Sequence, residues 1–165
     1  MSLKVIPIEK VVPVNREDPN WLKSLFGDFP SAIDLALNRF PDHDKWPEYD
    51  PNLKYGIAWF EGESFPNFNA VDERLAQEGF GPDKRTFPFH LAIEVVPRCD
   101  QLWKACQQGE GPRWIHTSST QSYWRDDDGG LCLPYVFVSP DDRGVDASWV
   151  RRNFHDGGGF LVSCK

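Results

Sequence analysis

The chain has no long hydrophobic run. None of its apolar segments approaches the roughly 18 to 20 residues that a membrane-spanning helix needs, so we expect no membrane helix. The first ten residues hold an apolar core too short for a signal peptide, and Glu9 interrupts them. We therefore expect a cytoplasmic protein.

The sequence also lacks the short motifs of common enzymes and cofactor sites. Its glycine-rich segments have neither the GxGxxG spacing of a dinucleotide-binding loop nor the Lys-Ser/Thr of a phosphate-binding loop. There is no GxSxG nucleophile elbow, and residues 126–128 lack the alternating ligands of a calcium loop. No HxH or HExxH spacing occurs among the histidines, which are His43, His90, His116 and His155. We therefore expect no cofactor and no metal.

Cysteine is scarce and is not arranged for disulfide or metal chemistry. No CxxC pair occurs among Cys99, Cys106, Cys132 and Cys164, and cytoplasmic thiols stay reduced. Cys99, Leu102 and Cys106 are spaced i, i+3 and i+7, which places two thiols on one face of a helix. We predict that all four cysteines are ordinary thiols, two of them on a buried helix face.

The clearest local pattern is an alternation of apolar and mixed residues over residues 86–96. The odd positions from Phe87 to Val95 are all apolar, which is typical of a half-buried strand. We predict a central strand here. It is followed by a helix over residues 101–106, with Asp100 as the N-cap.

The remaining patterns predict a mixture of strands and helices. Strands are expected over residues 4–14, 55–60, 113–117, 121–125, 131–138 and 160–164, and helices after Asp18, Ser31, Asn69 and Asp146. The Asp-Gly pair at residues 128 and 129 predicts a hairpin, and Pro134 requires an edge or a bulge. The length of 165 residues is typical of one domain. We predict a single α+β domain over residues 1–165, with a largely antiparallel sheet and helices mainly on one side.

Basic residues are outnumbered, and the imbalance is local. The formal net charge of −7 disfavours nucleic acid and anionic membranes as partners. Residues 41–83 hold ten acidic residues against three basic ones, whereas acids and bases are equal in number before and after this segment. The whole charge excess therefore lies in this segment.

Residues 41–54 form the most unusual part of the acidic segment. They contain three prolines and no helix or strand pattern, which predicts a long loop. Aromatic side chains among carboxylates can anchor a partner that the charges steer. We predict a partner-binding surface made of Asp42, Asp44, Trp46, Glu48, Tyr49 and Asp50. The alternative is that both rings pin the loop to the body of the protein and the acids form a solvated surface.

These features favour a small binding protein over an enzyme. We expect an inhibitor of the immunity type, which neutralises a basic protein partner such as a bacterial toxin; the analogy rests on charge and size, since no motif carries it. Its carboxylates would take the place of nucleic-acid phosphates in a cationic cleft. The alternative is a small hydrolase in which a histidine acts with Asp or Glu, or with Cys132. We assign no catalytic residue and predict no oligomeric state.

Overall fold

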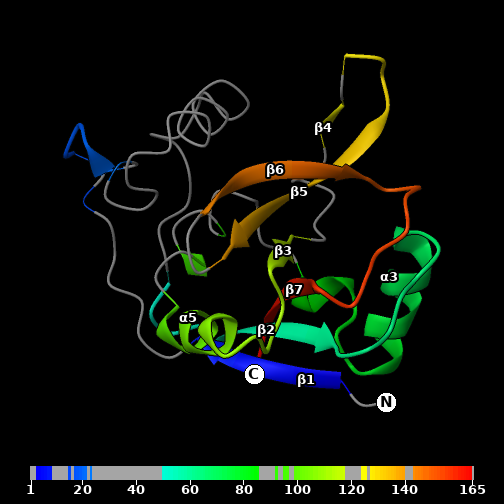
Figure 1. Cartoon of the computed structure of the whole chain (residues 1–165), viewed down its shortest axis with the longest axis horizontal. Helices are drawn as coiled ribbons and strands as arrows, with labels where there is room; N and C mark the ends of the chain where they lie inside the picture. Colours follow the sequence, from blue (N-terminus) through cyan, green and yellow to red (C-terminus); the bar gives the residue numbers. More distant parts are fainter. Residues whose placement is uncertain are drawn as a thin grey trace.

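The computed structural model describes residues 3–8, 15, 17–21, 23, 50–85, 92, 95–96, 99–117, 124–125, 127–139 and 143–164. Within them the chain forms a seven-stranded sheet and two α-helices (Figure 1). In chain order the elements are β1 (Leu3–Ile8), β2 (Tyr55–Phe60), α3 (Phe68–Gln77), the 3-10 helix η2 (Pro82–Lys84), α5 (Asp100–Gln107), β3 (Trp114–His116), β4 (Trp124–Arg125), β5 (Leu131–Val138), β6 (Arg143–Trp149) and β7 (Gly158–Ser163). Among these residues, no helix has the length and apolar character needed to cross a membrane. The predicted α+β class is confirmed.

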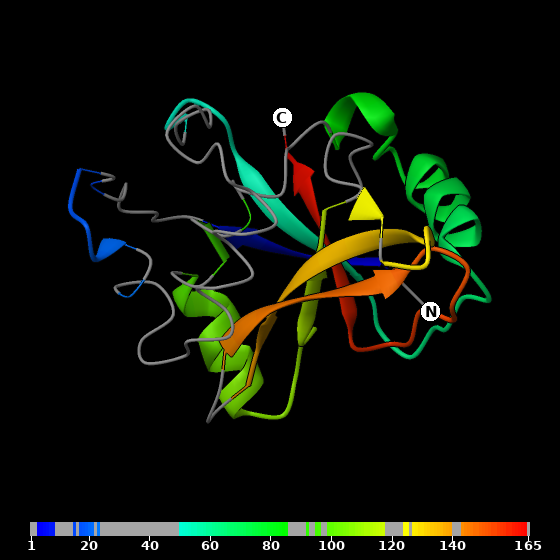
Figure 2. The same ribbon diagram turned by 90° about the horizontal axis from the view of Figure 1, so that it is seen from above.

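The strand that comes last in the chain lies in the middle of the sheet. The strand order is β1-β2-β7-β3-β5-β4, and β6 also pairs with β5. β7 runs antiparallel to β2 and parallel to β3, while every other described pair is antiparallel (Figure 2). The predicted edge position of β1 is confirmed, because β1 begins the strand order. The sheet is therefore largely antiparallel, as predicted.

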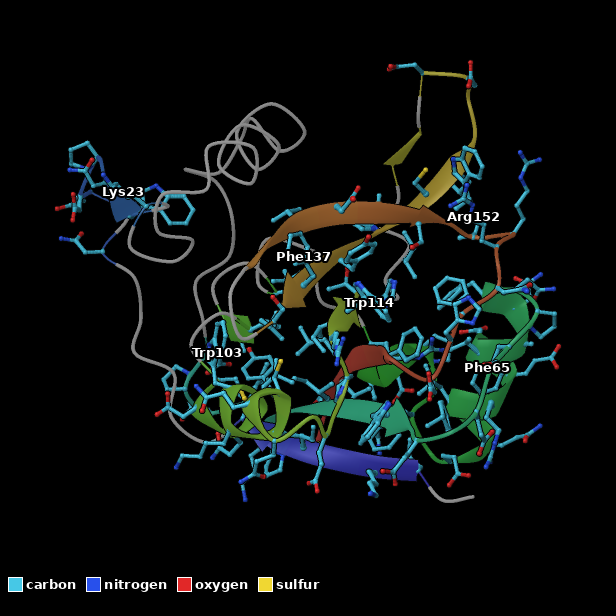
Figure 3. All side chains as sticks on the ribbon, viewed as in Figure 1. Lys23, Phe65, Trp103, Trp114, Phe137 and Arg152 are labelled. Atoms are coloured by element: carbon cyan, nitrogen blue, oxygen red, sulfur yellow. The ribbon has the colours of Figure 1, made fainter. Side chains whose placement is uncertain are left out.

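The two faces of the sheet carry separate hydrophobic cores. Ile57 of β2 belongs to one core with Leu102 of α5, and the next residue, Ala58, belongs to the other with Val71 of α3. Neighbouring residues of a strand point to opposite faces, so α5 and α3 cover opposite faces. Figure 3 shows Trp103 beside α5 and Phe65 beside α3, on opposite sides of the molecule. The expectation that the helices pack mainly on one side is not confirmed.

The described part of the predicted central strand is helical. Ala92 and Val95 lie in α-helical turns and Val96 in a 3-10 turn, and all three are buried. The strand prediction is wrong at these positions, and residues 86–91, 93 and 94 lie outside the described residues. Ala92, Val95, Val96 and Cys99 follow the spacing i, i+3, i+4 and i+7, and Leu102 continues it into α5. The sequence therefore contains a helical spacing of apolar residues as well as the alternating one. The residues with the helical spacing are those that pack in the core.

The last predicted helix is a strand. Residues Arg143–Trp149 form β6 and pair with β5 from Val138 to Cys132. A helix here would leave this edge of β5 unpaired, and unpaired edges are costly for a sheet. The side chain of Asp146, predicted to cap the helix, instead accepts a hydrogen bond from the amide of Ala147 at 2.8 Å.

Two predicted helix caps are shifted along the chain. The N-cap of α3 is Asn67, whose Oδ1 accepts the amide of Ala70 at 3.0 Å, whereas the predicted cap Asn69 lies inside the helix. Asp100 is the first residue of α5, and Cys99 holds its N-cap position without a side-chain hydrogen bond. Asp18 accepts the amide of Asn20 at 2.9 Å, ahead of helical residues at 21 and 23. The rest of that helix, and the helix predicted after Ser31, lie outside the described residues.

The predicted hairpin is confirmed, and β5 tolerates its proline for a local reason. Gly129 adopts a φ of +79° between β4 and β5. β4 pairs with Leu131 and Cys132, and β3 pairs with residues 135–137, so Pro134 falls between the two partners. The amide of Val138 donates toward β3, to Arg113, at 2.9 Å, and the nitrogen of Pro134 faces the same side because the pattern repeats every two residues. Pro134 therefore lies at a change of partner rather than at an edge.

Candidate functional site

The predicted partner-binding surface lies almost wholly outside the described residues. Asp42, Asp44, Trp46, Glu48 and Tyr49 fall there, and their grouping stays a prediction. Asp50 is half-buried, and its Oδ1 accepts the amide of Asn52 at 2.8 Å while its carbonyl accepts the amide of Leu53 at 3.1 Å. Asp50 thus shapes the turn that leads into β2.

The described part of the acidic segment is partly neutralised by the fold. Four of its carboxylates form ion pairs: Glu61 with Lys4, Glu63 and Glu78 with Arg74, and Asp72 with Arg85. Lys4 and Arg85 lie outside residues 41–83 in the sequence. The local excess of negative charge around the described residues of this segment is therefore smaller in the folded protein than the sequence alone indicates.

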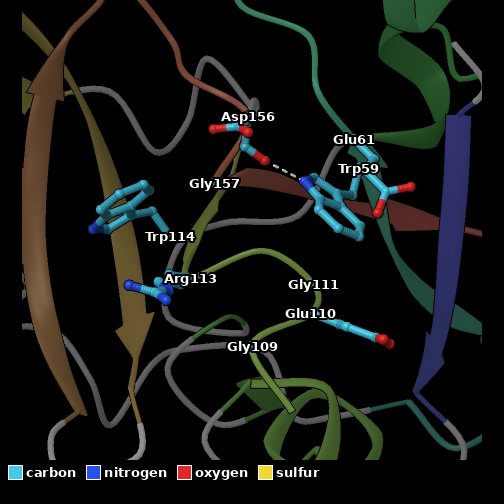
Figure 4. A pocket seen from close by; sticks show the side chains of 9 residues that line it. All are labelled: Trp59, Glu61, Gly109, Glu110, Gly111, Arg113, Trp114, Asp156 and Gly157. Atoms are coloured by element: carbon cyan, nitrogen blue, oxygen red, sulfur yellow. Dashed lines mark hydrogen bonds between the residues drawn. The ribbon is translucent and has the colours of Figure 1, made fainter. Parts of the chain in front are cut away.

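A cleft of about 350 Å³ opens at one end of the three central strands (Figure 4). Since β7 runs antiparallel to β2 and parallel to β3, the end of β2 lies beside the starts of β7 and β3. The lining residues come from four segments: the end of β2 and the turn after it (Trp59 and Glu61), the turn after α5 (Gly109, Glu110 and Gly111), the start of β3 and the residue before it (Trp114 and Arg113), and the segment before β7 (Asp156 and Gly157).

Two tryptophans face the cleft from opposite sides. Figure 4 shows Trp114 on one side and Trp59 on the other. Trp59 is only 8% exposed, and its Nε1 donates a hydrogen bond to the backbone carbonyl of Asp156. Trp114 is 39% exposed, an unusual exposure for so large an apolar side chain. The cleft thus has one fixed indole and one indole open to solvent.

Glycines set the shape of the cleft. Gly109 and Gly111 have φ values of +73° and +85°, which side chains rarely adopt. The amide of Gly109 bonds to the carbonyl of Cys106 at 3.0 Å, and the amide of Glu110 bonds to that of Ala105 at 2.8 Å. These bonds end α5 and leave Glu110 exposed at the cleft.

The start of β3 is fixed on the backbone before β7. The carbonyl of Gly157 accepts the amides of Arg113 at 2.7 Å and of Trp114 at 3.1 Å. The ring of Trp114 lies where a side chain at position 157 would be. The position of the exposed indole therefore depends on Gly157.

The charged groups of the cleft are mostly negative. Glu61, Glu110 and Asp156 face a single cation, Arg113. Figure 4 shows Arg113 beside Trp114, on the side opposite Glu61. On the outer side of the Trp59 wall, Nζ of Lys4 lies 5.5 Å from the indole centroid and pairs with Glu61.

His116 is the other chemically notable residue, and it is enclosed by aromatic rings. It is 3% exposed, and its ring centroid lies 5.1 Å from Tyr135, 5.2 Å from Phe154 and 5.4 Å from Phe160. Its Nδ1 lies 3.4 Å from the carbonyl oxygen of Gly159, and Nε2 has no hydrogen-bond partner among the described residues. Burial lowers the pKa of His116 to about 4. His116 thus lies in the strand predicted over residues 113–117, and only one of its ring nitrogens has a hydrogen-bond partner.

The cysteines are as predicted. No disulfide joins the four cysteines, all of which are described. Cys106 of α5 and Cys99 at its start are both buried, and burial raises the pKa of the Cys99 thiol. Within the described part of the chain, no group of three or more His, Cys, Asp or Glu side chains could hold a metal ion.

The cleft was not identified from the sequence. Its lining residues are spread from position 59 to position 157, and they meet only because β7 joins β2 to β3. The one local signal was the Gly-x-Gly at residues 109–111 directly after a helix, which marks a tight turn without indicating a site.

No family model, no curated protein and no solved structure matches this chain.

Proposed function

We propose that this chain is a small, acidic cytoplasmic binding protein that neutralises a basic protein partner, in the manner of an immunity protein acting on a bacterial toxin. The observation that supports it best is the cleft, whose lining combines the exposed indole of Trp114 with three carboxylates and one guanidinium. Exposed tryptophans are frequent anchors of protein interfaces, and surrounding carboxylates favour a cationic partner.

The predicted surface at residues 42–50 would act together with the cleft. Its four carboxylates would speed the encounter with a basic protein, and Trp46 or Tyr49 would slow dissociation. The net charge of −7 would also attract a basic partner.

The hydrolase alternative finds little support in the described residues. A catalytic histidine needs contact with substrate and a partner that orients it, whereas the ring of His116 is buried among Tyr135, Phe154 and Phe160. The Cys132 thiol donates to the carbonyl of Gly130 at 3.7 Å. His155 is exposed, and His43 and His90 lie outside the described residues.

The test is to co-express the chain with the products of its flanking genes in a bacterial host. We expect one of them to be a basic protein that stops growth, and we expect the chain to restore growth. The purified pair should co-elute in size-exclusion chromatography, and added salt should weaken the complex. If no flanking product is toxic, or if the chain leaves the toxicity unchanged, the proposal is wrong.

A further inference from the structure

We infer that the cleft receives one arginine side chain of the basic partner, with the guanidinium held by Trp114 and the surrounding carboxylates. The inference rests on the proposed function and adds the chemical identity of the group that is recognised. The cleft volume of about 350 Å³ is near the lower end of ligand pockets, roughly 300 to 1,000 Å³. A single long side chain fits such a space better than a protein segment does.

The exposed indole gives a planar surface for a planar cation. Trp114 is 39% exposed, and backbone hydrogen bonds from its own amide and that of Arg113 to Gly157 fix the start of β3. A guanidinium stacks on an indole face and presents five N–H donors in one plane. Those donors match carboxylate oxygens better than the single ammonium of lysine does.

The charges favour a cation over an anion. Three carboxylates face the cleft against one guanidinium, and Arg113 lies beside Trp114, opposite Glu61 (Figure 4). An anionic ligand would meet an excess of negative charge.

Lys4 is not among the lining residues, but it pairs with one carboxylate of the cleft wall. Its Nζ lies 5.5 Å from the centroid of Trp59 and pairs with Glu61, so an indole and a carboxylate of the cleft hold an ammonium of the same chain. Lys4 therefore competes with an incoming cation for Glu61. Removing the Lys4 charge should strengthen the binding of a cation, because it frees Glu61 and makes the local potential more negative.

A neutral sugar is the main alternative occupant, since tryptophans and carboxylates also line sugar sites. A sugar would need hydrogen-bond donors for its hydroxyl oxygens. The Nε1 donor of Trp59 is already used by the carbonyl of Asp156. Arg113 supplies donors and the carboxylates accept from hydroxyl groups, but a neutral sugar would leave the excess negative charge of the cleft uncompensated.

The experiment uses the full chain and three probes: N-acetylarginine amide, its uncharged isostere N-acetylcitrulline amide, and methyl glucoside. Binding is followed by NMR through the indole N–H signals. We expect saturable shifts of the Trp59 and Trp114 signals with the arginine probe, and binding at least about tenfold weaker for citrulline, because the charge supplies most of the attraction. Salt should weaken the arginine complex.

Four variants, with folding checked by circular dichroism, test the geometry. Trp114→Ala and Glu110→Gln should each raise the dissociation constant for the arginine probe about two- to fivefold. Lys4→Met should lower it, because Glu61 is released from its ion pair. Trp149→Ala is the matched control, since Trp149 lies in β6 away from the cleft and should leave binding unchanged.

The inference is overturned if citrulline or methyl glucoside binds as well as arginine, if no probe shifts the indole signals, or if Lys4→Met weakens binding. Its failure can be separated from that of the proposed function. If a basic partner is neutralised equally well by the Trp114→Ala and Glu110→Gln variants, the proposed function stands and the cleft is not its arginine site. If arginine binds here but no basic protein is neutralised, only the proposed function fails.

Discussion

The ring of Trp114 occupies the space that a side chain on Gly157 would need. A Cβ atom on Gly157 would lie 2.3 Å from Cζ3 and 2.8 Å from Cε3 of this ring, well inside van der Waals contact. The Trp114 ring, which forms the exposed wall of the cleft, can therefore keep its position only if residue 157 has no side chain.

We expect Gly157→Ala to displace Trp114 and to lower the free energy of unfolding by about 1 to 3 kcal/mol, as overpacking does. Urea denaturation measures the stability, and the Trp114 indole signal reports the displacement. Gly81→Ala is the control, because a Cβ there meets only the flexible Oδ1 of Asp83 at 3.0 Å. It should stay within about 1 kcal/mol of the wild type. An unchanged Trp114 signal in Gly157→Ala would contradict the coupling.

His116 should make the fold sensitive to acid. Burial lowers the pKa of His116 from 6.5 to about 4 in the folded protein, so the unfolded chain takes up the proton first as the pH falls. The contribution is fully present above pH 6.5 and is lost progressively down to about pH 4, to a total of roughly 3 kcal/mol.

The unfolding free energy of His116→Phe, measured from pH 7 to pH 4, should lack this contribution, because phenylalanine fits the aromatic surroundings without a titrating group. The exposed His155 gives the control, and His155→Gln should keep the pH dependence of the wild type. Equal acid sensitivity in His116→Phe and the wild type would show that other groups cause it.

Two asparagines near the start of α3 should differ sharply. Asn67 caps the helix by accepting the amide of Ala70, whereas Asn69 is exposed within the first turn. Asn67→Ala should cost about 1 kcal/mol of unfolding free energy, and Asn69→Ala should be neutral or slightly stabilising. Thermal denaturation of the two variants measures the difference. If Asn69→Ala lowered the unfolding free energy more than Asn67→Ala, Asn69 would be the cap.

The acidic loop should act on the rate of association. The quadruple variant Asp42→Asn, Asp44→Asn, Glu48→Gln and Asp50→Asn should bind the basic partner more slowly, with a weaker dependence on salt. Asparagine at position 50 can keep the side-chain acceptor for the amide of Asn52. Stopped-flow fluorescence measures the rate, and neutralising the exposed pair Asp127 and Asp128 in the hairpin is the control. Equal slowing in both variants would indicate a general charge effect without a surface at residues 42–50.

Strands with a strong local pattern were predicted correctly, and elements decided by distant partners were not. β2, β5 and the hairpin at Gly129 follow from apolar runs and turn residues close in sequence. Around Ala92 two periods coexist, and packing on the sheet selects the helical one. β6 is a strand because the edge of β5 is available to it, which no local pattern records.

The central place of β7 has a consequence for folding during synthesis. β7 (residues 158–163) is the strand that lies between β2 and β3. Roughly a hundred residues, counted from the start of β2, are therefore synthesised before the strand that joins β2 to β3. Until then the apolar strands expose unpaired edges, a state in which chains aggregate. Slow translation of residues 158–163, or a disruptive substitution in them, should therefore reduce the yield of folded protein far more than a comparable change in β1.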